Sequence, residues 1–270
     1  MASHTLEVQD LYVQIKNKQI IRGISFKIET NEVVALVGPN GHGKSCLLLT
    51  IIGHPKYQIA QGDILLDGKS IKNMPANERS RLGLFLAFQN PPEIVGVSNL
   101  DYYRNIIKND ELKRLVPFYK EVHKNLELVG LPEETTNREL NVGFSGGEKK
   151  RHELMQMQIL KPNFVLLDEI DSGLDVDAIN IVADIINMNK ETTGQLVISH
   201  YSRLYDMIKP TRAIVLVDGR IVHDGGTDVL HEIDKGGYAD FTKRRGISLE
   251  RTSGNNQELL GVCATKTSKK

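Results

Sequence analysis

The stretch that decides the fold is LVGPNGHGKSCLLL, residues 36–49. An apolar run, VVALV, leads into it and is typical of a strand buried on both faces. The run KSCLLLTII closes it, and we expect these residues, 44–52, to form a helix. The spacing GxxxxGK[ST] between them is satisfied by Gly38, Gly43, Lys44 and Ser45. A glycine-rich loop at a helix N-terminus offers backbone N–H groups to an anion, so the stretch predicts a nucleotide phosphate site.

The residue types in this loop predict separate roles. Lys44 would reach the terminal phosphates, and the Ser45 hydroxyl would bind Mg²⁺. His42 occupies a variable position, where we expect a solvent-facing loop residue. The expected nucleotide contacts extend over the whole loop, namely Gly38, Pro39, Asn40, Gly41, His42, Gly43, Lys44, Ser45 and Cys46.

A second apolar run, FVLLDE (164–169), ends in two acids. A buried strand would carry Asp168 to its end, where the carboxylate can orient Mg²⁺ through water. Glu169 can then act as the general base that polarises the attacking water. The alternative is an acidic pair that caps the next turn, but a phosphate loop in the same chain favours the catalytic interpretation.

Composition limits the classes of function. The chain has 270 residues, with 34 Lys and Arg against 34 Asp and Glu, which argues against a broad nucleic-acid-binding surface. No basic start with an apolar run suggests a signal peptide, and no apolar run is long enough to insert into a membrane. The two cysteines form no CxxC pair, which disfavours a carrier of iron–sulfur clusters. We therefore expect a cytoplasmic protein.

The order of the segments indicates a mixed α/β fold. Two strand-like segments open the chain and suggest an antiparallel β part, and further strands follow the phosphate loop. Residues 98–160 are mainly helical in pattern, so we expect a helical subdomain, near residues 90–160, inserted into an α/β core that carries the phosphate loop. We expect a single domain over residues 1–246 and a polar tail over 247–270.

Five motifs in order resemble those of the ATP-binding cassette (ABC) ATPases. The phosphate loop is followed by Gln89 in LAFQNP, which matches the Q-loop, and by FSGGE (144–148), which matches the signature sequence. SGLD (172–175) matches the D-loop, and His200 in VISH matches the switch histidine. The resemblance implies a P-loop, RecA-like core and catalytic roles for Lys44, Glu169 and His200. It also implies Mg²⁺ binding by Ser45, Gln89 and, through water, Asp168.

The flanks of these motifs resemble the SufC-type ATPases of the SUF system for iron–sulfur cluster assembly. The shared segments are LAFQNPPEIVGVSN, NVGFSGGEKKRHELMQM, DEIDSGLDVDA, ISHYSRL and GGYADF. This resemblance implies a non-membrane ATPase that binds SufB- or SufD-like scaffold proteins and forms an ATP-dependent, transient homodimer. In that dimer the nucleotide would also contact the partner's residues at the positions of Ser145, Gly146, Gly147, Glu148 and Asp175.

Two features depart from the family or leave alternatives open. Cys46 replaces the usual threonine, and a thiol is a weaker hydrogen-bond donor. Lys150, in GGEKKR, is either a resting-state partner of Glu169 or part of a solvated helix start. The remaining functional alternatives are a membrane transporter's ATP-binding subunit, a nucleotide-dependent dimerisation module without hydrolysis, and a GTPase. NKET (189–192) lacks the acid of the guanine-reading NKxD motif.

Overall fold

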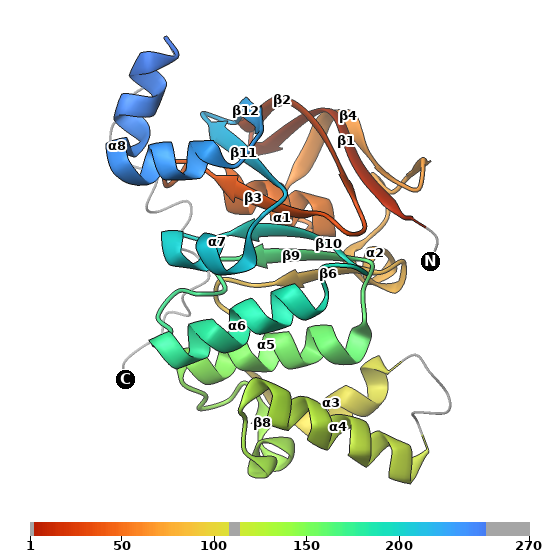
Figure 1. Ribbon diagram of the computed structural model, residues 1–270. Coiled ribbons are helices and arrows are strands. Elements are labelled where there is room, and N and C mark those ends of the chain that lie inside the picture. The colour runs from red at the N-terminus through yellow and green to blue at the C-terminus, as the bar shows by residue number, and fades with distance from the viewer. Residues whose placement is uncertain (1–2, 108–113, 247–270) are drawn as a thin grey trace, which may run out of the picture.

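The computed structural model describes residues 3–107 and 114–246. Two β-sheets with the helix α1 (Lys44–Ile52) between them form the upper part of the molecule in Figure 1, and a group of helices forms the lower part. The expected tail, residues 247–270, lies outside the described residues. Within the described ranges, no helix has the length and apolarity that crossing a bilayer requires.

The central sheet has six strands in the order β12-β11-β3-β10-β9-β6. All pairings are parallel except that of the edge strand β12 with β11. The strands are β3 (Val33–Val37), β6 (Leu84–Ala87), β9 (Phe164–Asp168), β10 (Gly194–Ile198), β11 (Arg212–Val217) and β12 (Arg220–Gly225).

The second sheet is antiparallel, with the order β2-β1-β4-β5. Its strands are β1 (Thr5–Ile15), β2 (Lys18–Glu29), β4 (Gln58–Leu66) and β5 (Lys69–Ser70). Leu47, Leu48 and Ile51 of α1 are fully buried in the apolar cluster that joins the two sheets. The short helix α2 (Ala76–Arg81) follows β5 and precedes β6.

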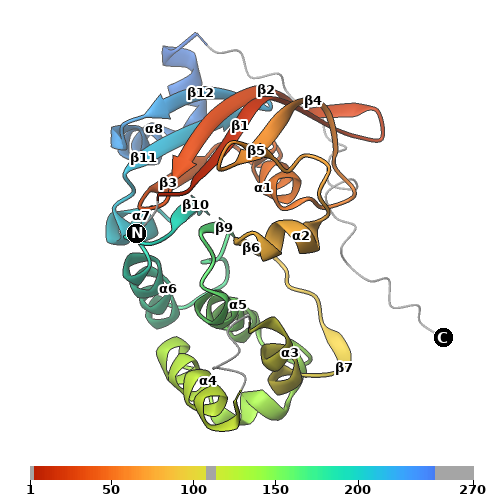
Figure 2. The ribbon, with the colours of Figure 1, turned by 90° about the vertical axis from the view of Figure 1, so that its right-hand side faces the viewer.

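Helices cover the other face of the central sheet and extend below it (Figures 1 and 2). Between β6 and β9 the chain forms β7 (Ile94–Ser98), α3 (Asn99–Ile106), α4 (Leu115–Val129), a 3₁₀ turn (Glu133–Asn137), β8 (Glu139–Leu140) and α5 (Gly146–Leu160). The helices after β9 are α6 (Val176–Met188), α7 (Ser202–Ile208) and α8 (Asp228–Arg244).

The strand β3 shows how the sequence pattern produces two cores. All five of its residues are buried. Val33, Ala35 and Val37 belong to the core shared with the helices, whereas Val34 and Leu36 belong to the core between the sheets. Side chains alternate across a strand, so a strand covered on both faces must be apolar throughout.

The predicted fold class is confirmed, with three differences in detail. The segment AIVLVDGRIV, whose apolar pattern predicts one strand, forms a hairpin of two strands, because Asp218 and Gly219 adopt positive φ angles of 46° and 71° and reverse the chain. The proline-containing segment after Gln89 includes a strand, β7, that pairs with β8. The helix α8 was not predicted, because its sequence contains two adjacent glycines.

A buried arginine secures the end of α1. Arg79, 2% exposed, donates from Nη1 to the carbonyl oxygens of Thr50 (2.9 Å) and Ile51 (2.8 Å). It also donates to the carbonyls of Met74 and Lys72 at 2.9 and 2.8 Å. The last carbonyls of a helix have no partners within the helix, and this guanidinium supplies a donor to the Ile51 carbonyl and a second donor to the Thr50 carbonyl, which also accepts from the Gly53 N–H at 3.0 Å.

We expect Arg79→Leu to lower the free energy of unfolding by about 2–4 kcal/mol, because several buried carbonyls lose their donor. Urea denaturation of the variant and of an Arg203→Leu control, at an exposed position on α7, measures the difference. A loss below about 1 kcal/mol in Arg79→Leu would contradict the capping role.

Candidate functional site

The site lies along the edge where the parallel strands β3, β10, β9 and β6 end. These four strands are neighbours in the sheet. The phosphate loop follows β3, Asp168 ends β9, and Gln89 and His200 come two residues after β6 and β10. Ligands of open α/β sheets bind outside the carboxyl ends of the strands. At this edge the fold brings together polar residues that lie up to about 160 positions apart in the sequence.

The phosphate loop begins where no side chain fits. A Cβ on Gly38 would lie 2.1 Å from the carbonyl oxygen of Leu216 in β11. Lys44 is 6% exposed, and its Nζ donates to the carbonyl oxygens of Gly38 (2.7 Å) and Pro39 (3.1 Å). Burial lowers the pKa of Lys44, while the nearby carboxylates of Glu169 and Asp168 raise it. The ammonium group therefore lies over the loop, within the space that a phosphate would enter.

The helix after the loop is built to receive an anion. Its N-cap residue is Gly43, and no side chain makes a capping hydrogen bond there. The first N–H groups of a helix have no partners within the helix, and its dipole favours negative charge at this end. Phosphate oxygens can supply both the missing acceptors and the charge.

Two oxygen-bearing side chains next to the loop form a site suited to Mg²⁺. The Ser45 hydroxyl donates to Oδ1 of Asp168 at 3.0 Å. Burial raises the pKa of Asp168 to about 6, and the hydrogen bond from Ser45 opposes that rise. No group of three or more His, Cys, Asp or Glu side chains in the described chain could hold a metal by itself. A hydroxyl and one carboxylate fit Mg²⁺, which binds through few carboxylates together with substrate phosphates.

Glu169 is held by both of its carboxylate oxygens. Gln89 Nε2 donates to Oε2 at 2.5 Å, and His200 Nε2 lies 3.2 Å from Oε1. The backbone of Glu169 has φ 50°, a left-handed conformation that costs energy in a residue with a side chain. Three residues predicted from separate motifs therefore meet at one carboxylate.

Lys150 has neither of the two roles considered for it. It is 3% exposed, so it is not part of a solvated helix start, and its Nζ donates to the carbonyl oxygen of Phe88 at 2.6 Å. The backbone N–H of Phe88 donates to Oε1 of Glu153 at 2.8 Å. Side chains of α5 thus form hydrogen bonds with both the N–H and the carbonyl of Phe88, the residue before Gln89. Burial lowers the pKa of Lys150 and raises that of Glu153, and the opposite charge of each partly offsets this effect on the other.

The signature residues form the N-terminus of α5. Ser145 is its N-cap: the Ser145 hydroxyl accepts from the Glu148 N–H at 3.2 Å, and the Ser145 N–H donates to Glu148 Oε2 at 2.7 Å. Glu148 also pairs with Arg138 at 3.0 Å. The hydrogen bond from the Ser145 backbone lowers the pKa of Glu148. These contacts present the helix N-terminus outward, and they join the signature to its own helix and not to the phosphate loop of the same chain.

The D-loop residue Asp175 is the N-cap of α6, where its side chain accepts from the Ala178 N–H at 2.8 Å.

A second contact in this region was missed by the sequence analysis. The Ser199 hydroxyl donates to Oδ2 of the buried Asp171 at 2.7 Å. This bond links the segment after Glu169 to the residue before His200. The only sequence signal is their position beside two motif residues.

Two loop residues have partners that the sequence did not reveal. His42 is not a solvent-facing residue, since only 11% of its side chain is exposed and its Nδ1 accepts from the N–H of Asp218 at 2.9 Å. The Asp218 carboxylate oxygen Oδ1 also lies 3.0 Å from Nδ1, and burial lowers the pKa of His42 while this carboxylate raises it. Cys46 is 3% exposed, and burial raises the pKa of its thiol, opposed by a hydrogen bond with the Tyr57 side chain.

Comparison with known proteins agrees with this arrangement. The family described as "ABC transporter" matches residues 21–172. The chain is 43% identical to "Vegetative protein 296" of Bacillus subtilis (strain 168), with 93% of this chain and 98% of the relative aligned. It is 45% identical to a probable ABC transporter ATP-binding protein of Streptococcus pyogenes serotype M18 over 92% and 99% of the two chains. It is 44% identical to the probable ATP-dependent transporter ycf16 of Cyanophora paradoxa, over 86% and 93%.

A solved structure shares the fold. It is a bacterial Atm1-family ABC exporter with ATP bound, with a TM-score of 0.70 and 20% sequence identity. The match covers 90% of this chain but only 42% of the exporter chain. The family match over residues 21–172 and the nearly full-length relatives place the chain in the ABC transporter family, as an ABC-type ATPase.

Proposed function

We propose that the residues at the sheet edge bind Mg-ATP and hydrolyse it with Glu169 as the general base. Lys44 and the loop amides hold the phosphates, and Ser45, Gln89 and, through water, Asp168 hold the metal. A metal held there would supply positive charge that offsets the negative charge of the phosphates. His200 lies beside the base, within 3.2 Å of its carboxylate, where it orients Glu169 and the terminal phosphate.

The contacts of Glu169 support a resting state in this proposal. A carboxylate whose two oxygens already accept hydrogen bonds is poorly placed to take a proton from water. When Gln89 turns its amide toward the metal site, Oε2 of Glu169 becomes free. The same side chain that senses the nucleotide then releases the base, so hydrolysis follows binding.

We further propose that two copies of the chain enclose the nucleotide. The signature residues Ser145, Gly146, Gly147 and Glu148 form an outward-facing helix N-terminus, and Asp175 begins a neighbouring helix. Each copy would direct these groups at the nucleotide held by the other. ATP shifts the balance toward the closed pair only by binding it more tightly than the open one.

The coupled reaction that we propose is iron–sulfur cluster assembly on a SufB- or SufD-like scaffold. The observation that supports a docking surface here is an exposed apolar stripe on β7. Ile94, Val95 and Val97 are 42%, 76% and 36% exposed. An apolar stripe of this kind, which begins five residues after Gln89, is suited to protein contact.

Hydrogen bonds connect the residues just before the stripe to helix α5 and to the segment that precedes it. Lys149 of α5 donates to Glu93 at 2.6 Å, and Asn141 donates to the Pro92 carbonyl at 2.8 Å. Because Lys150 and Glu153 also hold Phe88, α5 and residues 88–93 form one unit. A displacement of Gln89 would therefore shift both the signature residues at the start of α5 and the apolar stripe on β7.

A second candidate is the ATP-binding subunit of a membrane transporter. The names of several relatives favour it, since they are described as probable ABC transporter ATP-binding proteins or ATP-dependent transporters. The stripe on β7 would then receive a permease. Purification together with the products of neighbouring genes separates the two candidates, because one yields scaffold proteins and the other a membrane subunit.

Replacing Glu169 by Gln should lower kcat at least about 100-fold, because an amide cannot accept the proton of the attacking water. ATP binding should persist, and the closed dimer should accumulate. Phosphate release and dimer mass with ATP measure both effects, with the exposed Glu127→Gln on α4 as a control. Substantial turnover in Glu169→Gln would remove this residue from the role of base.

Lys44→Ala should weaken binding of a non-hydrolysable ATP analogue at least about tenfold, because a charge-assisted contact with phosphate is lost. Lys209→Ala, an exposed cation at the end of α7, should leave affinity unchanged. Cys46→Thr should be neutral or bind slightly more tightly, because a hydroxyl is the better donor. Calorimetric titration tests all three, and clearly tighter binding by the unmodified chain than by Cys46→Thr would contradict the last expectation.

Ile94→Asp should abolish pull-down of the scaffold, because a charge placed in an apolar contact must be desolvated without a partner. Affinity for ATP should not change. Met188→Asp is the matched control, since Met188 is also apolar and 61% exposed but ends α6. Normal scaffold binding by Ile94→Asp would place the docking surface elsewhere.

A further inference from the structure

The first residue of the phosphate loop has a partner 200 residues away. The backbone N–H of Gly38 donates to the hydroxyl oxygen of Tyr238 at 3.0 Å. On its other side, the Gly38 carbonyl accepts from Lys44 at 2.7 Å, and its Cα lies against the Leu216 carbonyl. Tyr238 is therefore one of three residues that fix Gly38, and it alone comes from the C-terminal helix.

A break in α8 places this tyrosine. Gly237 has φ 69° and ψ 170°, which are not helical values, so the helix bends there (Figure 1). The left-handed φ suits glycine, because a side chain would strain it. Beyond the bend, Phe241 and Thr242 are 1% and 2% exposed, and the Thr242 hydroxyl donates to the Tyr238 carbonyl at 2.8 Å. The second half of α8 is thus anchored in the core, and this anchoring fixes the position of the Tyr238 hydroxyl.

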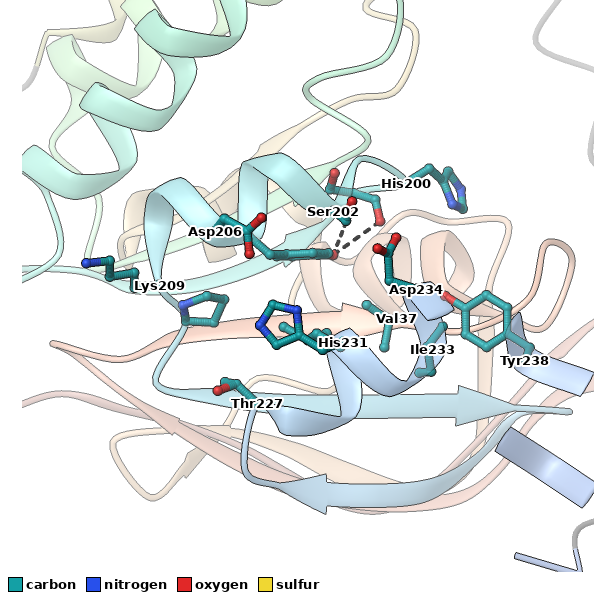
Figure 3. Close-up of a pocket in the computed structure, with 14 residues that line it drawn as sticks. Val37, His200, Ser202, Asp206, Lys209, Thr227, His231, Ile233, Asp234 and Tyr238 are labelled. Atoms are coloured by element: carbon teal, nitrogen blue, oxygen red, sulfur yellow. Dashed lines mark hydrogen bonds between the residues drawn. The ribbon is translucent and has the colours of Figure 1, made fainter. Parts of the chain in front are cut away.

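A pocket of about 500 Å³ lies beside this contact, between α7 and α8. Figure 3 shows Ser202 and Asp206 of α7 on one side and Asp234 and Tyr238 of α8 on the other. Its lining does not include Lys44 or Ser45, but it includes Val37 and His200, so the pocket adjoins the edge of the nucleotide site. The side of Tyr238 that lines the pocket is not packed against other atoms. The hydrogen bond with Gly38 therefore contributes more to fixing the position of the hydroxyl than it would in a close-packed core.

We propose that Tyr238 is a positioning residue for nucleotide binding. Its hydroxyl accepts the Gly38 N–H and holds the first peptide of the phosphate loop in the orientation from which the Gly38 carbonyl holds Lys44. Without this acceptor the start of the loop gains freedom that must be lost again when phosphate binds. Burial raises the pKa of Tyr238, so the group remains a neutral hydroxyl at physiological pH.

The proposal concerns the ATP site alone and is independent of which partner the chain serves. It predicts that Tyr238→Phe, which keeps the ring and removes the acceptor, raises the Kd for a non-hydrolysable ATP analogue about three- to tenfold. The kcat at saturating ATP should stay within about twofold, since no group at the reacting atoms has changed. Hydrogen exchange of the peptide that contains Gly38 should become faster in the nucleotide-free protein.

The matched control is Tyr102→Phe, because the Tyr102 hydroxyl also makes a side-chain hydrogen bond, in this case as donor to Gln156 Oε1 at 2.9 Å, but lies on α3 in the helical insertion. Gly237→Ala is a second variant that displaces Tyr238 through the backbone, and its Kd should rise in the same direction. An unchanged Kd in Tyr238→Phe would overturn the proposal. So would an equal rise in Tyr102→Phe, because the effect would then be general destabilisation. Failure of the unmodified chain to bind ATP would instead contradict the nucleotide site itself.

Discussion

Burial of β3 on both faces is the constraint on which the rest of the site depends. The strand is covered by helices on one face and by the second sheet on the other, and it lies between β11 and β10 in the central sheet. The only open side of its carboxyl end is therefore the edge of the sheet, beside the ends of these two strands. The backbone of β11 then closes so tightly on the chain that Gly38 must have no side chain. The loop, the lysine that it positions and the helix that it starts all take their places from that one strand.

The parts of the fold that the sequence predicted are those whose residues interact locally. The apolar runs of β3 and β9 and the helix α1 were recognisable because their periodicity and length reflect their own burial. The motif residues were recognisable because backbone geometry at a phosphate leaves few alternatives to glycine, lysine and serine. The contact of Glu169 with Gln89 and His200 was not predicted; it arises because the three residues follow or end neighbouring parallel strands.

The remaining contacts depend on which distant segments pack together, and no local pattern encodes this. A lysine in a run of charges has the same appearance whether it is solvated, as expected of a helix start, or buried against a carbonyl, as Lys150 is. The partner of His42 lies in a hairpin that begins 170 residues later. The pair Asp171 and Ser199 is joined only because β9 and β10 are neighbours. In each case a polar group is buried, and the fold supplies a partner from another element.

The long sequence separation between Gly38 and Tyr238 has a consequence for how the protein is made. Chains are synthesised from the N-terminus, and the loop emerges from the ribosome about 200 residues before the tyrosine that holds it. The hairpin that contacts His42 also emerges late. A nascent chain therefore lacks these two contacts with its phosphate-binding sequence until about 200 further residues have been made. The contacts that Tyr238 and the β11–β12 hairpin make with the loop can form only after the chain has been synthesised as far as α8.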